Sequence, residues 1–283
     1  MGGISNVGNN ISKIPGGVSY ASSPSAISIL PNTISWPSTN FDPATVALIA
    51  RMTPAPSAAR AIIINNLVVA LKAADIWAYL DLLYLTAAFS SQSARLNWVS
   101  SNYTLTPVGA PTFVADQGYQ GDGSTSYCGS GYLPATNGVN WNVNDAAIWM
   151  WTRTNSSETN ADIGAGTGFV SAIISRDATG NMGALVNRTG TNLTVAVPTS
   201  VGLSGAQRRS ANDERLWKDG VETVTGSAAA GGRPSSEFRI CGRSPSSYSN
   251  RQVSFAAAGA ALAGKEAAFY AAINTYMQAV GAA

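Results

Sequence analysis

The segment GYQGDGST, residues 118–125, has the spacing of a loop that could bind phosphate. It matches the pattern G-x-x-x-x-G-K-[ST] at every fixed position except one, where Ser124 replaces the lysine. Such a loop holds its anion with the lysine and with the N-terminus of a helix that follows directly. The segment SYCGSGYLP follows here, and its glycines and proline do not favour a helix. We therefore expect a tight turn that leads into a strand, and no nucleotide site.

The loop YLPATNGVNWN, residues 132–142, combines aromatic rings with amide side chains. A glycan site needs both, because the rings cover the apolar faces of sugars and the amides bond their hydroxyls. The candidate glycan-binding residues are Tyr132, Asn140, Trp141 and Asn142. The alternative is a surface loop that binds no ligand and whose Trp141 packs on the rim of the domain.

Catalytic chemistry is poorly supported by the composition. The chain has no histidine, which removes the commonest general base and the commonest metal ligand. A polysaccharide hydrolase needs two carboxyl groups at a defined separation. The adjacent acids Asp213 and Glu214 stand among basic residues and indicate a solvated hairpin face instead. A pair from separate segments, such as Asp162 with Asp177, stays open, but we expect no catalytic residue, no metal site and no cofactor.

Charge and hydropathy limit the possible partners. The 17 basic residues are scattered and the net charge is +2, so we expect no nucleic-acid binding. We expect no membrane span, because polar residues interrupt the most apolar segment, residues 61–85, and we expect no signal peptide. Cys128 and Cys241 lack the spacing of a metal or redox site, and form either a disulfide or two buried thiols.

The first hundred residues divide into two parts. Residues 1–40 are rich in Gly, Ser, Asn and Pro and show no sustained hydrophobic period, which predicts an extended arm held by a neighbouring subunit. Residues 41–98 carry apolar residues at three- and four-residue steps. We expect three helices there, one beginning at Pro43 behind the cap Asp42, one at Ser57 and one near Asp75.

The remaining chain has the pattern of short strands separated by Gly and Asn turns, which is typical of a sandwich or barrel. Asp219-Gly220 predicts a tight two-residue hairpin turn. Trp149 and Trp151 share one face of a strand and indicate core packing or an interface between sheet and helix. A helix over residues 265–280 closes the chain, with Gly281 as its cap. Strands are expected over residues 112–115, 126–129, 146–153, 169–176, 183–187, 192–197, 214–218, 221–224, 238–242 and 252–259.

Five sequence blocks occur in an order that resembles the concanavalin A-like lectin and laminin-G sandwich, namely FVADQGYQGDGSTSYCGSGY, AAIWMWTRT, RLWKDGVET, FRICGRS and VSFAAAGAALAGKEAAFYAAINTYM. The resemblance implies a jelly-roll β-sandwich and, in many members, glycan binding. Some members are glycosidases with a Glu-x-Asp-x-x-Glu strand, which is missing here. The segment LVVALKAADIWAYLDLLYLTAAFSSQSARLNWV also resembles a helical segment that precedes such domains in virion proteins of tailed bacteriophages.

The sequence therefore predicts a mainly β protein with an extended docking arm (1–40), a helical segment (41–98), a lectin-like sandwich (99–262) and a C-terminal helix packed on it (263–283). The resemblance indicates a non-enzymatic bacteriophage virion protein, made in the host cytoplasm and located on the virion exterior as a head fibre, decoration protein or tail-fibre component. Its expected partners are other virion proteins, bound through residues 1–40, further copies of itself and cell-surface glycan. The alternatives are a polysaccharide depolymerase and a capsid or tail brace without a ligand.

Overall fold

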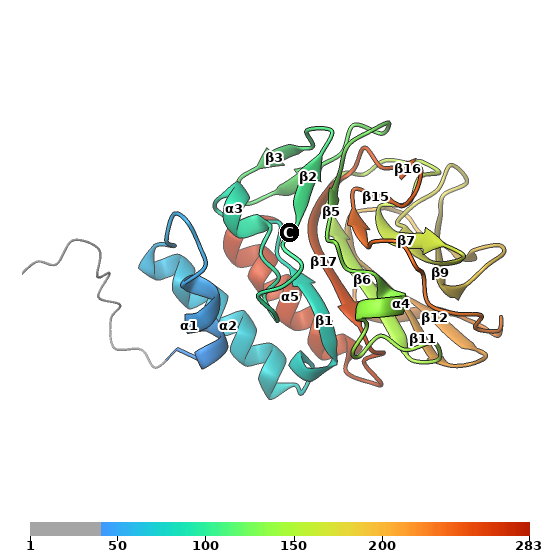
Figure 1. Ribbon diagram of the computed structural model, residues 1–283, viewed down its shortest axis with the longest axis horizontal. Coiled ribbons are helices and arrows are strands. Elements are labelled where there is room, and N and C mark those ends of the chain that lie inside the picture. The colour runs from blue at the N-terminus through green and yellow to red at the C-terminus, as the bar shows by residue number, and fades with distance from the viewer. Residues whose placement is uncertain (1–40) are drawn as a thin grey trace, which may run out of the picture. The chain divides into compact units, whose positions relative to one another are not determined.

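The computed structural model describes residues 41–283, so the expected arm of residues 1–40 lies outside the described residues. Two antiparallel sheets pack face to face (Figure 1). One has eight strands in the order β13-β12-β11-β6-β17-β4-β3, and β1 also pairs with β17. The other has seven strands in the order β10-β9-β8-β7-β14-β5-β2. The expected mainly β sandwich with a C-terminal helix is confirmed.

The eight-stranded sheet contains β1 (Leu80–Tyr84), β3 (Thr112–Val114), β4 (Gly118–Gln120), β6 (Ala146–Thr152), β11 (Gly202–Ser210), β12 (Asp213–Lys218), β13 (Val221–Gly226) and β17 (Gln252–Gly259). The seven-stranded sheet contains β2 (Thr106–Val108), β5 (Tyr127–Gly129), β7 (Ile163–Thr167), β8 (Phe169–Ile174), β9 (Asn181–Arg188), β10 (Leu193–Ala196) and β14 (Arg239–Ile240). A separate hairpin joins β15 (Gly242–Arg243) to β16 (Ser247–Tyr248). The helices are α1 (Pro43–Ile49), α2 (Ala58–Ala73), the 3-10 turn η1 (Trp77–Tyr79), α3 (Ser91–Ala94), α4 (Pro134–Asn137) and α5 (Glu266–Val280). No helix within residues 41–283 is long and apolar enough to cross a membrane.

The core lies between the two sheets, because alternate residues of each central strand point toward the opposite sheet. Ile148 and Met150 supply this face of β6, and Ile173 and Val186 supply it from β8 and β9. All four side chains are fully buried. The residues between them point to the outer faces of the sandwich. The helix α5 covers the outer face of one sheet, and the hairpin β15–β16 lies beside the outer face of the other.

The helix α5 covers the outer face of the eight-stranded sheet (Figure 1). The indole of Trp149 meets Phe269 edge to face at a centroid distance of 5.2 Å, and Trp151 stacks on Tyr270 at 6.3 Å. Gly205 on the neighbouring strand leaves the space that Trp149 fills, since a Cβ there would lie 2.0 Å from the indole. The predicted interface between sheet and helix is confirmed.

The third expected helix, near Asp75, is wrong. After the short turn η1 the chain forms β1, whose residues pair with Ala256–Gly259 of β17 in antiparallel register. Four of its five residues are buried, because the strand joins the sandwich. A short apolar run such as LDLLYL fits a helix and a buried strand equally well, and only the available partner strand decides between them.

The expected signals at the other element ends are confirmed. The Asp42 carboxylate accepts from the Ala44 backbone N–H at 2.8 Å and caps α1, and the Ser57 hydroxyl accepts from the Arg60 N–H at the start of α2. Asp219 and Gly220 have φ angles of 50° and 79° and form the hairpin turn between β12 and β13. These signals act between residues close in sequence, so they are legible without the tertiary structure.

Candidate functional site

A carboxylate from β1 bonds the loop of residues 132–142 at four points. Asp81 accepts a hydrogen bond of 2.6 Å from the Tyr132 hydroxyl. It also accepts from the backbone N–H groups of Val139 at 3.1 Å, Asn140 at 2.9 Å and Trp141 at 3.0 Å. Asp81 was not among the residues predicted for a site, although a single acid within an apolar run is a usable signal of a buried polar contact. Arg233 bonds three backbone carbonyls of the same loop, so Asp81 is one of the side chains that fix the loop's conformation.

The rings of Tyr132 and Trp141 point into the protein and are fully buried. The Trp141 indole N–H donates to Asn187 Oδ1 at 2.9 Å, and its ring meets Phe238 edge to face. Burial raises the pKa of the Tyr132 hydroxyl, and the adjacent Asp81 raises it further. This corrects the expected role of the two rings: they support the loop from below, and neither offers a free face to a sugar.

Asn140 and Asn142, the other two candidates, lie on the solvent side of the loop and line open hollows. Asn140 lies between a hollow of about 270 Å³, which Tyr103 also lines, and one of about 260 Å³, which it shares with Asn142 and Asp145. Their Nδ2 groups donate to backbone carbonyls, at 3.4 Å from Asn140 to Leu80 and at 3.1 Å from Asn142 to Asn140. Within residues 41–283 their Oδ1 atoms have no hydrogen-bond partner, so both are free to accept from a ligand hydroxyl.

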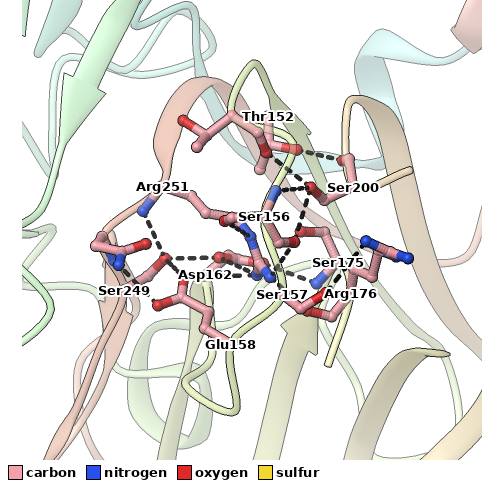
Figure 2. Close-up of polar contacts among 12 residues, drawn as sticks. Thr152, Ser156, Ser157, Glu158, Asp162, Ser175, Arg176, Ser200, Ser249 and Arg251 are labelled. Atoms are coloured by element: carbon pink, nitrogen blue, oxygen red, sulfur yellow. Dashed lines mark hydrogen bonds and ion pairs between the residues drawn. The ribbon is translucent and has the colours of Figure 1, made fainter. Parts of the chain in front are cut away.

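A cluster of ionisable side chains lies at another place, where the ends of β8 and β17 meet the loop before β7 (Figure 2). Arg251 Nη1 lies 3.0 Å and 2.9 Å from the two carboxylate oxygens of Asp162, and 3.5 Å from Glu158 Oε1. The Ser249 hydroxyl lies between the two carboxylates and contacts both. The Ser175 backbone N–H donates to Asp162 at 2.7 Å.

Glu158 and Asp162 are carboxylates, as the catalytic acids of a glycosidase are, but they are not accessible to a substrate. Burial raises the pKa of Glu158, as a general acid requires. Asp162 and Arg251 are fully buried, however, and every oxygen of Asp162 is already bonded. A glycosidase leaves room between its carboxyl groups for a sugar or a water, whereas here one arginine and one serine fill that space. The arrangement is that of a buried ion pair that joins three chain segments.

The structure decides one possibility that the sequence left open, the pair of Asp162 with Asp177, and corrects one expectation, the solvated position of Glu214. Asp177 binds its own turn through the Thr179 N–H at 2.8 Å, so it does not share a site with Asp162. Glu214 does not lie on a solvated face: its side chain is fully buried and lies 2.6 Å from the Arg188 guanidinium. It pairs as well with buried Arg208, and burial raises its pKa. The reason is that β12 lies inside the sheet edge formed by β13, with β9 of the other sheet above it.

The GYQGDGST segment forms the expected tight turn between β4 and β5. The Asp122 carboxylate accepts from the backbone N–H groups of Ser124, Thr125 and Ser126 at 2.8–2.9 Å. These bonds, led by that from Thr125, hold the pKa of Asp122 far below its usual range. The amide groups that would cradle a phosphate in a nucleotide site are thus occupied by the chain's own carboxylate.

Cys128 and Cys241 are free thiols, and both are fully buried. Burial raises the pKa of Cys128 to about 12 and that of Cys241 well above its usual value. The Cys241 thiol donates to the Tyr119 carbonyl at 3.3 Å. Of the two possibilities that the sequence left open, the structure contains the pair of thiols, and neither is activated for chemistry.

A hollow of about 520 Å³ lies between α2 and α5, which run side by side in Figure 1. Alanines dominate its lining, and no charged side chain contributes. Among residues 41–283 no group of three or more Cys, Asp or Glu side chains could hold a metal ion. The hollows beside Asn140 therefore carry more of the polar chemistry of ligand binding than the larger apolar one.

Comparison with known proteins adds information on the fold. No sequence model of a protein family matches this chain, and no curated protein has a matching sequence. Among solved structures, the chain is similar to Trypanosoma rangeli sialidase in complex with a difluorinated nononic acid, with a TM-score of 0.51, 11% identity, 76% of this chain and 40% of that chain covered. It is also similar to the binding domain of botulinum neurotoxin serotype D (TM-score 0.48, 9% identity, 70% and 52% covered) and to domain 4 of AbnA, an arabinanase from Geobacillus stearothermophilus, in complex with arabinotriose (0.43, 12%, 66% and 99%). The chain spans less than half the length of the sialidase, and at this identity the likeness shows the β-sandwich fold alone.

Proposed function

We propose that this chain is a non-enzymatic structural protein of a bacteriophage virion whose sandwich binds glycan. The observation that carries the binding part is the loop held by Asp81, which presents the free Oδ1 acceptors of Asn140 and Asn142 at two adjoining hollows. The virion part rests on the sequence resemblance and on the composition of residues 1–40.

The chemistry of these hollows suits a neutral sugar. Sugar hydroxyls donate hydrogen bonds, and an amide oxygen held in place by bonds from its own nitrogen accepts them without losing further side-chain freedom. Tyr103 lines the larger hollow and is partly exposed, and its ring is fixed edge to face against Tyr132 at a centroid distance of 5.1 Å. Tyr103 can therefore supply the aromatic surface that the buried rings do not.

The binding proposal is tested with an array of bacterial surface glycans and with titration calorimetry on any neutral glycan that binds. Asn140→Ala should weaken binding about fivefold, the usual effect of one lost hydrogen bond, and Tyr103→Ala should weaken it further. Asn144→Ala is the matched control, because Asn144 is exposed nearby but lines neither hollow. Equal binding by all three variants would place the glycan elsewhere, and the absence of any binding would favour the brace without a ligand.

The virion proposal assigns residues 1–40 to the contact with another virion protein, outside the described residues. Deleting them should leave a folded sandwich that no longer joins phage particles. The measurement is the amount of protein in purified particles assembled with full-length or truncated chain, and a monomer-to-oligomer comparison of the two in solution. Normal incorporation of the truncated protein would contradict the assignment.

A polysaccharide depolymerase is the second candidate, and the raised pKa of Glu158 beside Asp162 is the observation that favours it. In that case the protein would release reducing ends from the capsule or lipopolysaccharide of its host, and Glu158→Gln would abolish the release. Glu222→Gln serves as control, because Glu222 lies on the exposed edge strand β13 and pairs with Arg215. We expect that the wild-type protein and both variants release no reducing ends.

A further inference from the structure

The outer face of the seven-stranded sheet carries a trough of about 290 Å³ on the far side of the sandwich core. Its floor is made by side chains that alternate with core residues: Val170, Ala172 and Ile174 from β8 and Leu185 from β9. Ala172 is paired in register with Leu185, so these residues form one continuous apolar surface. This volume is just below the usual range for drug-sized ligands and has room for about one sugar ring.

The hairpin β15–β16 forms one wall of this trough and places a cation there. The Arg243 side chain lies against the backbone of Gly166, where a Cβ would come within 2.4 Å of Nη1. Its guanidinium makes one weak hydrogen bond, of 3.3 Å, to the carbonyl of the next residue, Ser244. Within the part of the chain that the structure describes, Arg243 forms no ion pair. Most of its donors are therefore free.

Arg95, Arg153 and Arg176 also lack a carboxylate partner among the described residues and make one side-chain hydrogen bond each, but none of them lines the trough. Two other arginines without a carboxylate partner, Arg51 and Arg233, are held more firmly than Arg243. Arg51 donates to two backbone carbonyls at 2.8 Å and 2.9 Å, and Arg233 donates to three, so both serve to hold loops together. Burial alone lowers the pKa of Arg243, and no acidic neighbour raises it. A partly buried cation without a counter-ion is unfavourable by itself and gains when an anion enters.

Further polar groups stand around the same apolar floor. Ser247 accepts from the Ala161 N–H at 2.8 Å, which leaves its hydroxyl hydrogen free to donate. Asn192 lines the opposite wall, and its amide makes no hydrogen bond within residues 41–283. One apolar floor, one unpaired guanidinium and two uncharged polar groups match a sugar ring that carries a carboxylate, because a planar carboxylate accepts two parallel bonds from an arginine fork.

We propose that this trough binds an acidic sugar residue, with its carboxylate on Arg243 and one face of its ring on Ala172 and Leu185. The inference rests on the proposed glycan-binding function and adds a charge-selective site to it, lined by residues that are separate from those around Asn140. Because an ion pair carries the selectivity, the preference for the acidic sugar should weaken as salt is raised.

The test compares a disaccharide ending in glucuronate with the same disaccharide ending in glucose, by calorimetry on the full-length protein. We expect the glucuronate form to bind at least about tenfold more tightly, since its bonds to Arg243 are charge-assisted. Arg243→Gln should remove this preference. Ala172→Leu fills the trough without changing charge and should weaken binding of the glucuronate form as well. Arg153→Gln is the matched control, because Arg153 bonds Gly281 at the end of α5 and lies outside the trough.

The thermal unfolding of each variant is measured first, so that a loss of binding is not a loss of fold. Equal binding of the two disaccharides, no binding of the glucuronate form, or an unchanged preference in Arg243→Gln would overturn the inference. The outcomes of the two proposals can be told apart. If Asn140→Ala weakens binding of a neutral glycan, the loop site is supported, whether or not Arg243→Gln changes the preference for the acidic sugar. An acidic preference that depends on Arg243 but not on Asn140 supports the trough and counts against the loop.

Discussion

Replacing Asp81 by alanine should destabilise the protein by about 3–4 kcal/mol. Four donors lose their acceptor in this variant, namely the Tyr132 hydroxyl and three backbone N–H groups of the following loop. Val139 is exposed, and water can replace the bonds of its backbone and of the adjacent Asn140. The Tyr132 hydroxyl and the Trp141 backbone N–H belong to fully buried residues. Each of these two bonds to a charged acceptor costs about 1.5–2 kcal/mol when it is lost.

Chemical unfolding followed by tryptophan fluorescence measures this cost, and a thermal scan should show a midpoint lower by about 6–16 °C for a domain of this size. The control is Asp75→Asn, because the Asp75 side chain is 76% exposed and its ion pair among the described residues is a 3.4 Å contact with Lys265. Asparagine tolerates the φ angle of 53° at this position as aspartate does. That variant should lie within about 0.5 kcal/mol of the wild type. A cost below about 1 kcal/mol for Asp81→Ala would show that the loop does not depend on the carboxylate, and the reasoning about the candidate site would fail with it.

Three further predictions test the interior and the glycine-rich turn. The pKa of Asp122 is lowered in the folded protein, so its contribution to stability is present above its unfolded pKa of about 4 and is lost as the pH falls below it; Asp122→Asn should therefore flatten the fall of the unfolding midpoint between pH 5 and pH 2, and an unchanged slope would contradict this. Gly205→Ala places a methyl group 2.0 Å from the Trp149 ring and should cost about 1–3 kcal/mol in denaturant unfolding, whereas a variant as stable as the wild type would mean that the indole shifts freely. Cys128 and Cys241 should react with a thiol reagent at pH 8 only after denaturation, giving two thiols per chain without reductant, and a count of zero would reveal a disulfide.

Local sequence predicted the elements whose signals lie within a few residues. The caps of α1 and α2, the Asp219-Gly220 turn and the apolar face of α5 belong to this class. The turn at Asp122 belongs to the same class, because the carboxylate and the N–H groups that bond it lie within four positions of one another. Each depends on backbone geometry or on a helical period that the nearby residues impose, so the tertiary structure adds nothing to the decision.

The strand β11 could not be predicted in the same way. Its sequence, GLSGAQRRS, has no alternation of apolar and polar residues, and yet it lies between β6 and β12 with seven of its nine residues buried. Gly205 of this strand makes room for Trp149 from β6. Arg208 of the strand is buried because it pairs with Glu214 on β12 and donates to the Val186 carbonyl on β9. The partners that justify these residues lie on other strands, where a local pattern cannot register them.

For the candidate site, too, some features follow from the sequence and others from the tertiary structure. The sequence by itself determined a β-sandwich, a loop rich in rings and amides, and a glycine-rich turn without the lysine of a phosphate site. Only the tertiary structure decided that Trp141 points inward, because its indole N–H bonds Asn187, 46 positions along the chain, and that Asp81 holds the loop from 51 positions before Tyr132. A buried polar group must find its partner wherever the fold brings one, and the identity of that partner is set by the packing of the sheets and not by the residues beside it in sequence.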